Sequence, residues 1–180
     1  MNIFFKILWF AFFLLKTTAL FSEDTKIKIG VLAPLTGENA ALGKQIISSI
    51  RMALIDINDN RIEIYPRDTK SDPNIALGSA LELEKLGITL VIGPVYYKNL
   101  LHLQEIKNIT FLSLTNKTLD LPKNIISTGI NSTSQLNTIK KFLKLNDIKK
   151  TIFLIPNVNY DLEIKKGIKD SKLKFYKKYN

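Results

Sequence analysis

The sequence predicts an α/β fold, a doubly wound and mostly parallel β-sheet with helices on both faces. Short apolar runs rich in β-branched residues recur along the chain, which is typical of buried strands. Between most of them lie stretches whose apolar residues repeat about every 3.6 positions, which predicts amphipathic helices. With 180 residues, 46% of them hydrophobic, the chain is long and apolar enough to form a core. Strands separated by helices of this length imply parallel pairing.

The predicted strands are short apolar runs bounded by polar or turn-forming residues. They are residues 27–33, 61–68, 88–93, 109–114, 124–129, 150–156 and 173–179. Helices are predicted at residues 40–57, 72–86, 97–105, 132–145 and 160–170. Asp72 followed by Pro73 is a typical helix start, and Gly87 favours the left-handed conformation that ends a helix. Ser132 and Gln135 predict a capping box at the start of the fourth helix.

The loop after the first strand, PLTGENAALGKQ at residues 34–45, has some features of a phosphate-binding loop. Such a loop needs four residues between its glycines, and then Gly-Lys followed by Ser or Thr. Here five residues separate Gly37 from Gly43, and Gln45 stands where the hydroxyl should be. We therefore do not predict a nucleotide enzyme, and we expect Thr36 and Gly37 to turn the chain off the first strand.

The composition excludes several kinds of chemistry. The chain has no Cys, which excludes disulfides, thiolate metal ligands and a cysteine nucleophile. Its single histidine, His102, cannot form a histidine cluster for zinc. The sequence also has no Gly-x-Ser-x-Gly elbow and no nucleophile–base pair at the predicted strand ends. We therefore predict no catalytic residue, no metal site, no cofactor and no enzymatic activity.

The formal net charge of +10 raises the question of a nucleic-acid partner. The lysines are scattered, however, and become denser only between residues 140 and 178. Aromatic residues do not alternate with them as a base-stacking surface would require. Lys, Ile and Asn are abundant along the whole chain, which indicates a compositional bias. We predict no nucleic-acid partner.

Residues 1–22 are predicted to be a secretory signal peptide. Lys6 precedes an apolar run of nine residues from Ile7 to Leu15, and polar and small residues follow as far as Ser22. A membrane-spanning helix needs about 20 apolar residues. Cleavage of the segment is favoured, and its retention as a membrane anchor is the alternative, because the cleavage site is not a clean Ala-x-Ala. In both cases the rest of the chain is delivered outside the cytoplasm.

Four motifs occur at the predicted strand ends, where parallel sheets bind ligands. They are IGVLAPLTGENAALGKQI, DTKSDPNIAL, LVIGPVYY and FLSLTN. Their order and spacing resemble the first lobe of the Leu/Ile/Val-binding type of periplasmic binding protein, the type I fold. The later stretch TIFLIPNVNYDLEIKKGI resembles the first unit of that family's second lobe. The resemblance implies a first lobe at residues 23–145, then a crossover and an incomplete second lobe at residues 146–180. It also implies a periplasmic protein whose lobes close on a ligand by hinge motion.

Two branches of this family fit, and both stay open. Substrate-binding subunits of ABC importers resemble the chain at DTKSDPNIAL, but they usually carry serines or threonines after the third and fourth strands. Here these places read PVYYK at residues 94–98 and LTNK at residues 114–117. The domain that activates penicillin-binding proteins resembles the chain at VIGPVYYKNLLHL and LSLTN, and it is slightly favoured. The implied partners are a small polar solute or amino acid with an ABC permease, or a cell-wall synthase.

The resemblance places eight candidate ligand-binding side chains at the strand ends. They are Thr36, Tyr96, Tyr97, Lys98, Thr115, Asn116, Lys117 and Tyr160. Each also has a purely structural interpretation, because tyrosines often pack, asparagines shape turns and lysines face solvent. The second lobe is nearly absent, and one lobe alone buries little of a small ligand. We expect a fragment of a longer gene product, and the alternative is a single lobe whose partner is another protein.

Overall fold

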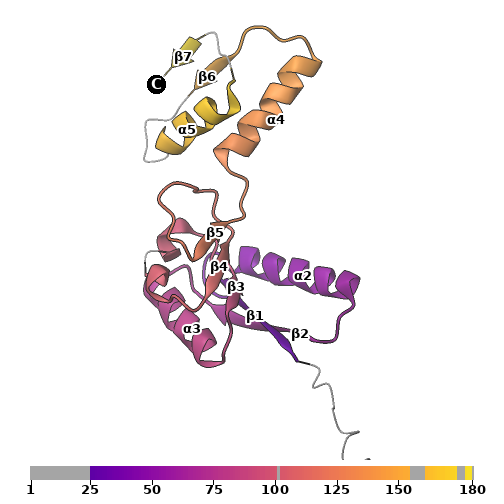
Figure 1. Ribbon diagram of the computed structural model, residues 1–180, viewed down its shortest axis with the longest axis vertical. Coiled ribbons are helices and arrows are strands. Elements are labelled where there is room, and N and C mark those ends of the chain that lie inside the picture. The colour runs from indigo at the N-terminus through magenta and orange to yellow at the C-terminus, as the bar shows by residue number, and fades with distance from the viewer. Residues whose placement is uncertain (1–24, 101, 155–160, 174–176, 180) are drawn as a thin grey trace, which may run out of the picture.

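The computed structural model describes residues 25–100, 102–154, 161–173 and 177–179 (Figure 1). Its first part is a five-stranded sheet in the order β2-β1-β3-β4-β5, and each neighbouring pair runs parallel. The strands are β1 (Ile27–Ala33), β2 (Ile62–Asp68), β3 (Leu90–Ile92), β4 (Thr110–Ser113) and β5 (Ile125–Ser127). The strand order reverses between β1 and β3. The predicted doubly wound, mostly parallel α/β class is therefore confirmed.

Two helices lie on opposite sides of this sheet, α2 (Ala40–Ile57) and α3 (Pro73–Lys85) (Figure 1). The side of α3 holds the hydrophobic core, which two 3-10 turns, η1 (Tyr97–Leu100) and η2 (Leu103–Glu105), help to cover. The predicted short helix at residues 97–105 is thus a pair of tighter turns. The central core side chains are each at most 1% exposed: Leu32, Ala80, Leu83, Val91, Leu103 and Phe111.

The side of α2 is covered less completely. Gly43 is the one buried residue of this helix, and a Cβ atom there would lie 2.0 Å from the backbone oxygen of Pro34. Only glycine therefore allows α2 to come this close to the loop that precedes it. Farther along the helix, Ile55 is 75% exposed. We call β1 to β5 with α2, α3 and both 3-10 turns the sheet unit.

Most predicted helix ends are confirmed. Asp72 caps α3 by accepting hydrogen bonds from the amides of Asn74 and Ile75. Gly87 has a φ of 74° and follows the end of that helix. The predicted capping box at the fourth helix is wrong, because Asn131 is the cap and its side chain accepts from the amide of Ser134. Asn competes well for this position because its side-chain oxygen reaches the exposed first-turn amides.

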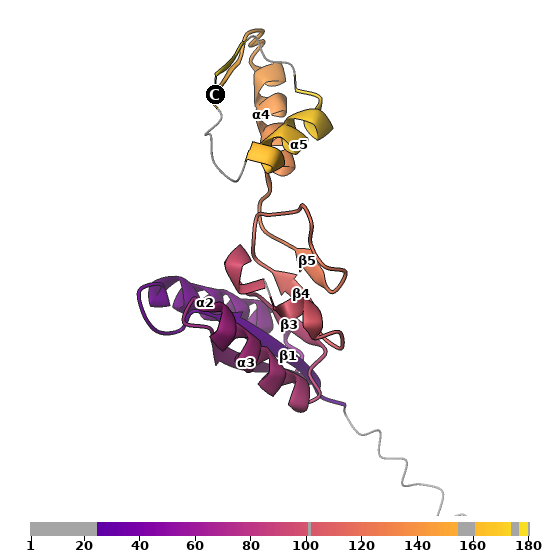
Figure 2. The ribbon, with the colours of Figure 1, turned by 90° about the vertical axis from the view of Figure 1, so that its left-hand side faces the viewer.

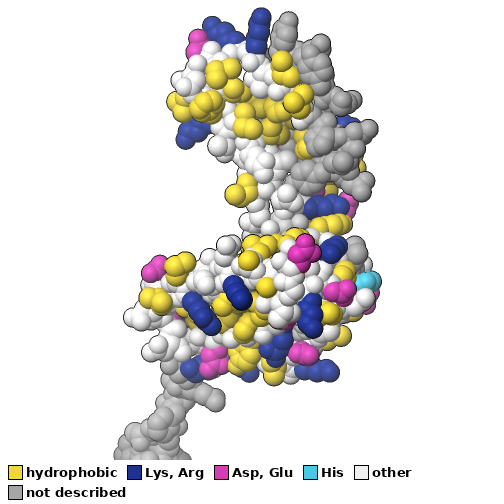
Figure 3. Space-filling model, turned by 180° about the vertical axis from the view of Figure 1, so that it is seen from behind, with side chains coloured by type: hydrophobic (Ala, Val, Ile, Leu, Met, Phe, Trp, Pro, Cys, Tyr) yellow, Lys and Arg dark blue, Asp and Glu magenta, His cyan; other side chains and the backbone are white. Residues whose placement is uncertain are grey.

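The rest of the chain forms a second, smaller unit beyond β5 (Figure 2). It contains α4 (Ser132–Leu145), β6 (Ile152–Leu154), α5 (Asp161–Ser171) and β7 (Lys177–Tyr179). β6 and β7 pair in parallel as a two-stranded sheet, and α4 packs along α5. Figure 3 shows hydrophobic side chains gathered on one face of this C-terminal unit. The predicted division of the chain after residue 145 remains a prediction. It assigned α4 to the first lobe, and in the structure α4 packs along α5.

The predicted signal segment, residues 1–22, lies outside the described residues. Within the described ranges, no helix combines the length and the apolar character needed to cross a membrane.

Candidate functional site

The carboxyl ends of β1, β2, β3 and β4 meet at one edge of the sheet, and we call the loops that follow them the strand-tip edge. In doubly wound sheets, ligands bind at this edge, beside the point where the strand order reverses. The backbone there is tightly built. Gly93 has a φ of 100°, and a Cβ atom on it would lie 2.2 Å from the backbone oxygen of Leu32. The loop that carries Tyr96, Tyr97 and Lys98 therefore leaves β3 at a position that only glycine can occupy.

Asp68, at the end of β2, organises the first part of this edge. Its Oδ1 accepts hydrogen bonds from the amides of Leu35 at 2.8 Å, Thr36 at 3.3 Å and Lys70 at 2.9 Å. Its Oδ2 accepts a further bond from the Thr36 hydroxyl. Burial by itself raises the pKa of the Asp68 carboxyl, but these hydrogen bonds outweigh burial and hold the pKa below its usual value. The candidate Thr36 is thus part of a fixed loop.

A tyrosine in the loop after β3 contacts a lysine in the loop after β4. The Nζ of Lys117 lies 3.7 Å from the centre of the Tyr97 ring, which is a cation–π contact. Tyr97 is 36% exposed, Tyr96 is partly buried, and Lys98 is exposed. The structure therefore brings together two candidates that are 20 residues apart in the sequence, and Lys117 already occupies one face of the Tyr97 ring.

Hydroxyl groups help to hold the segment that follows β4. Thr115 is 4% exposed, and its Oγ1 accepts a hydrogen bond from the amide of Lys117 at 3.3 Å. The amide of Thr115 donates to the Oγ of Ser113, which in turn donates to the backbone oxygen of Pro94 at 2.9 Å. These bonds tie the β4 loop to the β3 loop. Asn116 is exposed on this loop.

Glu163, on α5 of the C-terminal unit, reaches the same loop. Its side chain accepts hydrogen bonds from the Thr118 amide at 2.8 Å, the Thr118 hydroxyl at 2.9 Å and the Leu119 amide at 2.7 Å. Burial raises the pKa of the Glu163 carboxyl, but the bonds from Leu119 and Thr118 and the charge of Lys117 outweigh burial, so the pKa is lowered. The loops of the strand-tip edge are thus bonded to two carboxylates, Asp68 at the end of β2 and Glu163 on α5.

Sequence reasoning identified part of this arrangement. It named Tyr97, Lys117 and Thr115, which the structure brings into contact along one loop system, and it named Thr36, which lies on Asp68. Tyr160 lies outside the described residues. Sequence reasoning did not select Asp68 or Glu163. The position of Asp68 at the end of a predicted strand was a usable signal, whereas Glu163 lies in a lysine-rich helix that offers no local signal.

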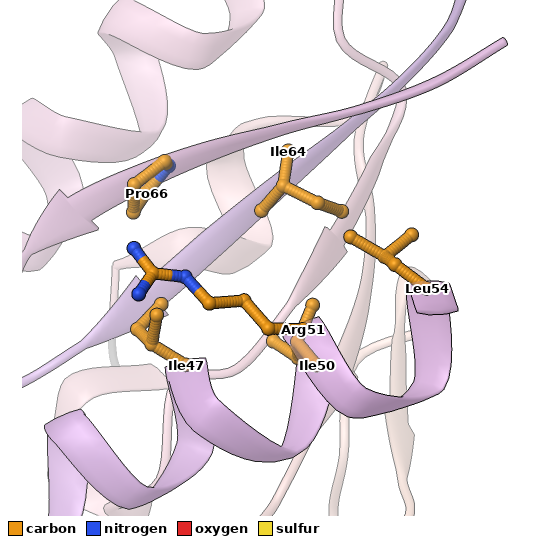
Figure 4. A pocket seen from close by; sticks show the side chains of 6 residues that line it. All are labelled: Ile47, Ile50, Arg51, Leu54, Ile64 and Pro66. Atoms are coloured by element: carbon orange, nitrogen blue, oxygen red, sulfur yellow. The ribbon is translucent and has the colours of Figure 1, made fainter. Parts of the chain in front are cut away.

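Two cavities lie away from the strand-tip edge. One, of about 210 Å³, separates α2 from β2 and is lined by Ile47, Ile50, Arg51, Leu54, Ile64 and Pro66. Figure 4 shows the Arg51 side chain reaching across it toward Pro66. The other, of about 580 Å³, lies near the amino ends of β4 and β5 and is lined by residues that include Lys107 and Lys123. Among the described residues, no group of three or more His, Asp or Glu side chains could hold a metal ion.

Comparison with known proteins agrees with this fold. The sequence model of the family described as "Periplasmic binding protein" matches residues 26–172. The uncharacterised protein MJ1266 of Methanocaldococcus jannaschii is 31% identical over 109 residues, which cover 56% of this chain and 25% of that protein.

Several solved structures have a similar backbone. Full-length LpoA from Haemophilus influenzae has a TM-score of 0.65 at 17% identity over 87% of this chain and 30% of LpoA. The leucine-binding protein LivK from Thermotoga maritima has a TM-score of 0.60 at 19% identity over 85% of this chain and 47% of LivK. A branched-chain amino-acid ABC transporter ligand-binding protein from Burkholderia xenovorans has a TM-score of 0.65 at 14% identity over 85% of this chain and 45% of that one. At these identities the likeness concerns the fold, and the chain spans less than half the length of each structure.

Proposed function

Because the chain belongs to the periplasmic binding protein family, we propose that it is an exported, non-enzymatic protein that recognises a ligand or a partner in the periplasm. The strand-tip edge is the recognition surface in this proposal. Tyr96, Tyr97, Lys98, Thr115, Asn116 and Lys117 supply its contacts, together with Thr36 and Tyr160. Turnover of an ester or a nucleotide by the purified protein would contradict the non-enzymatic part of the proposal.

Within this family we favour recognition of a protein partner, in the manner of an activator of a penicillin-binding protein. One observation carries this choice: three of the candidate side chains at the strand-tip edge are already engaged with other groups of the protein. The Thr36 hydroxyl lies on Asp68, the Thr115 hydroxyl holds the amide of Lys117, and Lys117 covers Tyr97. A small solute would have to compete with these bonds. A protein partner can instead bind the preformed surface without breaking these bonds.

The resemblance to LpoA indicates which kind of protein the partner is in this proposal. LpoA from Haemophilus influenzae is called a regulator of PBP1A, and we propose a cell-wall synthase as the partner of this chain. The test is direct binding between this chain and a purified bifunctional synthase from the same envelope, together with the rate of glycan polymerisation. We expect saturable binding and a faster rate. A well-folded chain that neither binds the synthase nor changes its rate would contradict the activator role.

A matched pair of variants locates the surface. Tyr97→Ala removes an aromatic side chain at the strand-tip edge, and Phe142→Ala removes an exposed aromatic side chain from α4 in the C-terminal unit. Aromatic anchors dominate most protein interfaces, so Tyr97→Ala is expected to weaken synthase binding roughly tenfold. Phe142→Ala is expected to leave it unchanged. Equal effects from the two variants would remove the strand-tip edge from the proposal.

The alternative function is the substrate-binding subunit of an ABC importer, with a permease as partner. The fold likeness to LivK and to the Burkholderia protein supports it. A panel of amino acids in a thermal unfolding assay separates the two roles. A ligand at about 100 times its dissociation constant stabilises the folded state by about 2.7 kcal/mol. Such a shift with any amino acid would favour the importer over the activator.

A further inference from the structure

Glu163 makes the polar bridge between the two units of the molecule. It is 2% exposed, although it is charged and belongs to a helix that is otherwise rich in exposed lysines. Among the described residues, its side chain accepts three hydrogen bonds from Thr118 and Leu119, which are 45 and 44 residues away in the sequence. A buried carboxylate is tolerated only where donors replace its lost water. The donors that the described residues supply to this carboxylate come from the neighbouring unit.

The loop that Glu163 binds is the loop that carries the candidate site. Thr118 directly follows Thr115, Asn116 and Lys117, and the positive charge of Lys117 acts on the same carboxylate. Lys117 also stacks on Tyr97 at the end of β3. A change in the position of Glu163 is therefore expected to move the loop after β4 and, through the contact of Lys117 with Tyr97, the loop after β3.

On its other side, Glu163 is fixed to α4. Its backbone oxygen accepts a hydrogen bond of 2.7 Å from the Ser132 hydroxyl, which is itself buried. One turn further along α5, a Cβ atom on Gly167 would lie 2.8 Å from the Oγ of Ser132, so the two helices cross in close contact. α4 and α5 thus pack together as one rigid pair, and the Glu163 carboxylate extends from this pair to the loop after β4. A movement of the C-terminal unit must carry this carboxylate with it.

We propose that Glu163 is a positioning residue that clasps the Thr118–Leu119 loop and so sets the orientation of the C-terminal unit over the strand-tip edge. The relevance of this orientation to recognition rests on the proposed function, but the clasp itself does not. The main cluster of buried hydrophobic residues lies within the sheet unit, between Leu32 and Ile125 in the sequence, whereas Leu136 and Leu173 are buried in the C-terminal unit. Removing the clasp is therefore expected to release the orientation of the units while the sheet unit stays folded.

The first measurement is the distance between the two units, which requires no ligand. The chain has no Cys, so Met52→Cys on α2 and Leu145→Cys on α4 give two unique and exposed sites for spin labels. In the full chain, electron–electron double resonance is expected to show a narrow distance distribution. Glu163→Gln is expected to broaden or shift it, because an amide places an N–H group against the backbone donors. Glu82→Gln is the matched control, since Glu82 is an exposed ion-pair partner of Arg67.

The second measurement is amide hydrogen exchange at Thr118 and Leu119. Hydrogen bonds to a charged group are among the stronger ones, so Glu163→Gln is expected to speed exchange at both amides about tenfold or more. Exchange at Phe111 and Val91 in the core is expected to stay unchanged. Thr118→Val removes only the hydroxyl donor and is expected to act in the same direction with a smaller effect.

The outcomes separate this proposal from the proposed function. Wider distances and faster exchange support the clasp, even if no partner or solute is ever found to bind. A narrow distribution and unchanged exchange in folded Glu163→Gln and Thr118→Val overturn it, even if a synthase binds. A change in core exchange of equal size would show a general loss of stability, and it would also overturn the positioning role.

Discussion

The two faces of the five-stranded sheet are built differently. On the face of α3, Val91 and Phe111 are fully buried in the core. Side chains alternate along a strand, so their neighbours Ile92 and Leu112 point to the face of α2, where both remain partly exposed. Next to Leu112 in the register, Ile126 is 50% exposed. On the face of α2, Val31 and Ala33 of the central strand β1 are fully buried, so hydrophobic burial stabilises β3 to β5 mainly from the face of α3.

This difference changes what holds the strand-tip edge in place. α2 begins at that edge, but it adds little buried apolar surface. Its start is fixed instead by the close approach of Gly43 to Pro34 and by hydrogen bonds between neighbouring loops. One bond joins the Asn39 amide group to the Ser71 hydroxyl at 3.0 Å, and the Asp68 carboxylate supplies others. We infer that α3 governs the global stability and that polar contacts govern the geometry of the edge.

The largest effect is expected when the stability contributed by the two faces of the sheet is compared with one substitution on each face. Leu83→Ala on α3 removes a fully buried side chain, and such changes cost about 2–5 kcal/mol of unfolding free energy through lost burial and a cavity. Leu54→Ala on α2 removes a side chain that lines the open cavity beside β2, and we expect a loss of about 1 kcal/mol or less. Urea unfolding of the two variants and the unchanged protein measures both. Equal losses would contradict the one-sided stabilisation of the sheet.

The sequence predicted the strands and helices well because each depends on local pattern. The apolar run at residues 27–33 and the cap at Asp72 carry their signals within a few neighbours, and the structure confirms both. The capping box at Ser132 failed, because Asn131, one residue earlier, bonds the same first turn. Local pattern also could not show that α4 packs along α5.

The sequence predicted those candidate residues that lie at the ends of strands, but it did not predict the contacts between them. The predicted ends of β3 and β4, together with the family resemblance, were enough to nominate Tyr97 and Lys117. The bonds that organise the edge join residues far apart in the sequence, such as Asp68 with Leu35 and Glu163 with Thr118. No periodicity or spacing encodes such pairs, so a single sequence leaves them hidden.

An intermediate effect is expected at the start of α2. Gly43→Ala would place a Cβ atom 2.0 Å from the backbone oxygen of Pro34, and backbone cannot yield as a flexible side chain does. The helix must shift, at a cost of about 1–3 kcal/mol. Gly78→Ala on α3 is the matched control, because no atom outside its chain neighbours and the adjacent helix backbone lies within 4 Å of the position that its methyl group would take. A helical alanine gains about 0.5–1 kcal/mol over glycine. Thermal unfolding of both variants measures the difference, and a neutral Gly43→Ala would show that α2 is not fixed at this contact.

The smallest expected effect concerns the polar contacts themselves, and it depends on pH. The folded-state pKa of Asp68 is lowered, so its ionised form contributes stability above the unfolded-state pKa of about 3.9, and this contribution is lost as the pH falls through the folded-state pKa. Asp68→Asn is therefore expected to cost about 1–2 kcal/mol at pH 7, the size of a net hydrogen bond to a charged group. Its deficit relative to the unchanged protein should shrink steadily below about pH 4.

Leu83→Ala serves as the control in the same titration, because lost apolar packing does not titrate. Urea unfolding from pH 7 down to about pH 3 should show a constant deficit for Leu83→Ala and a shrinking one for Asp68→Asn. If both deficits stayed constant, the Asp68 carboxylate would not be the group that fixes the loop of Leu35 and Thr36. The geometry of the edge would then have to come from the close approach of Gly43 to Pro34 and the Asn39–Ser71 hydrogen bond, and the polar side of the contrast could not be assigned to Asp68.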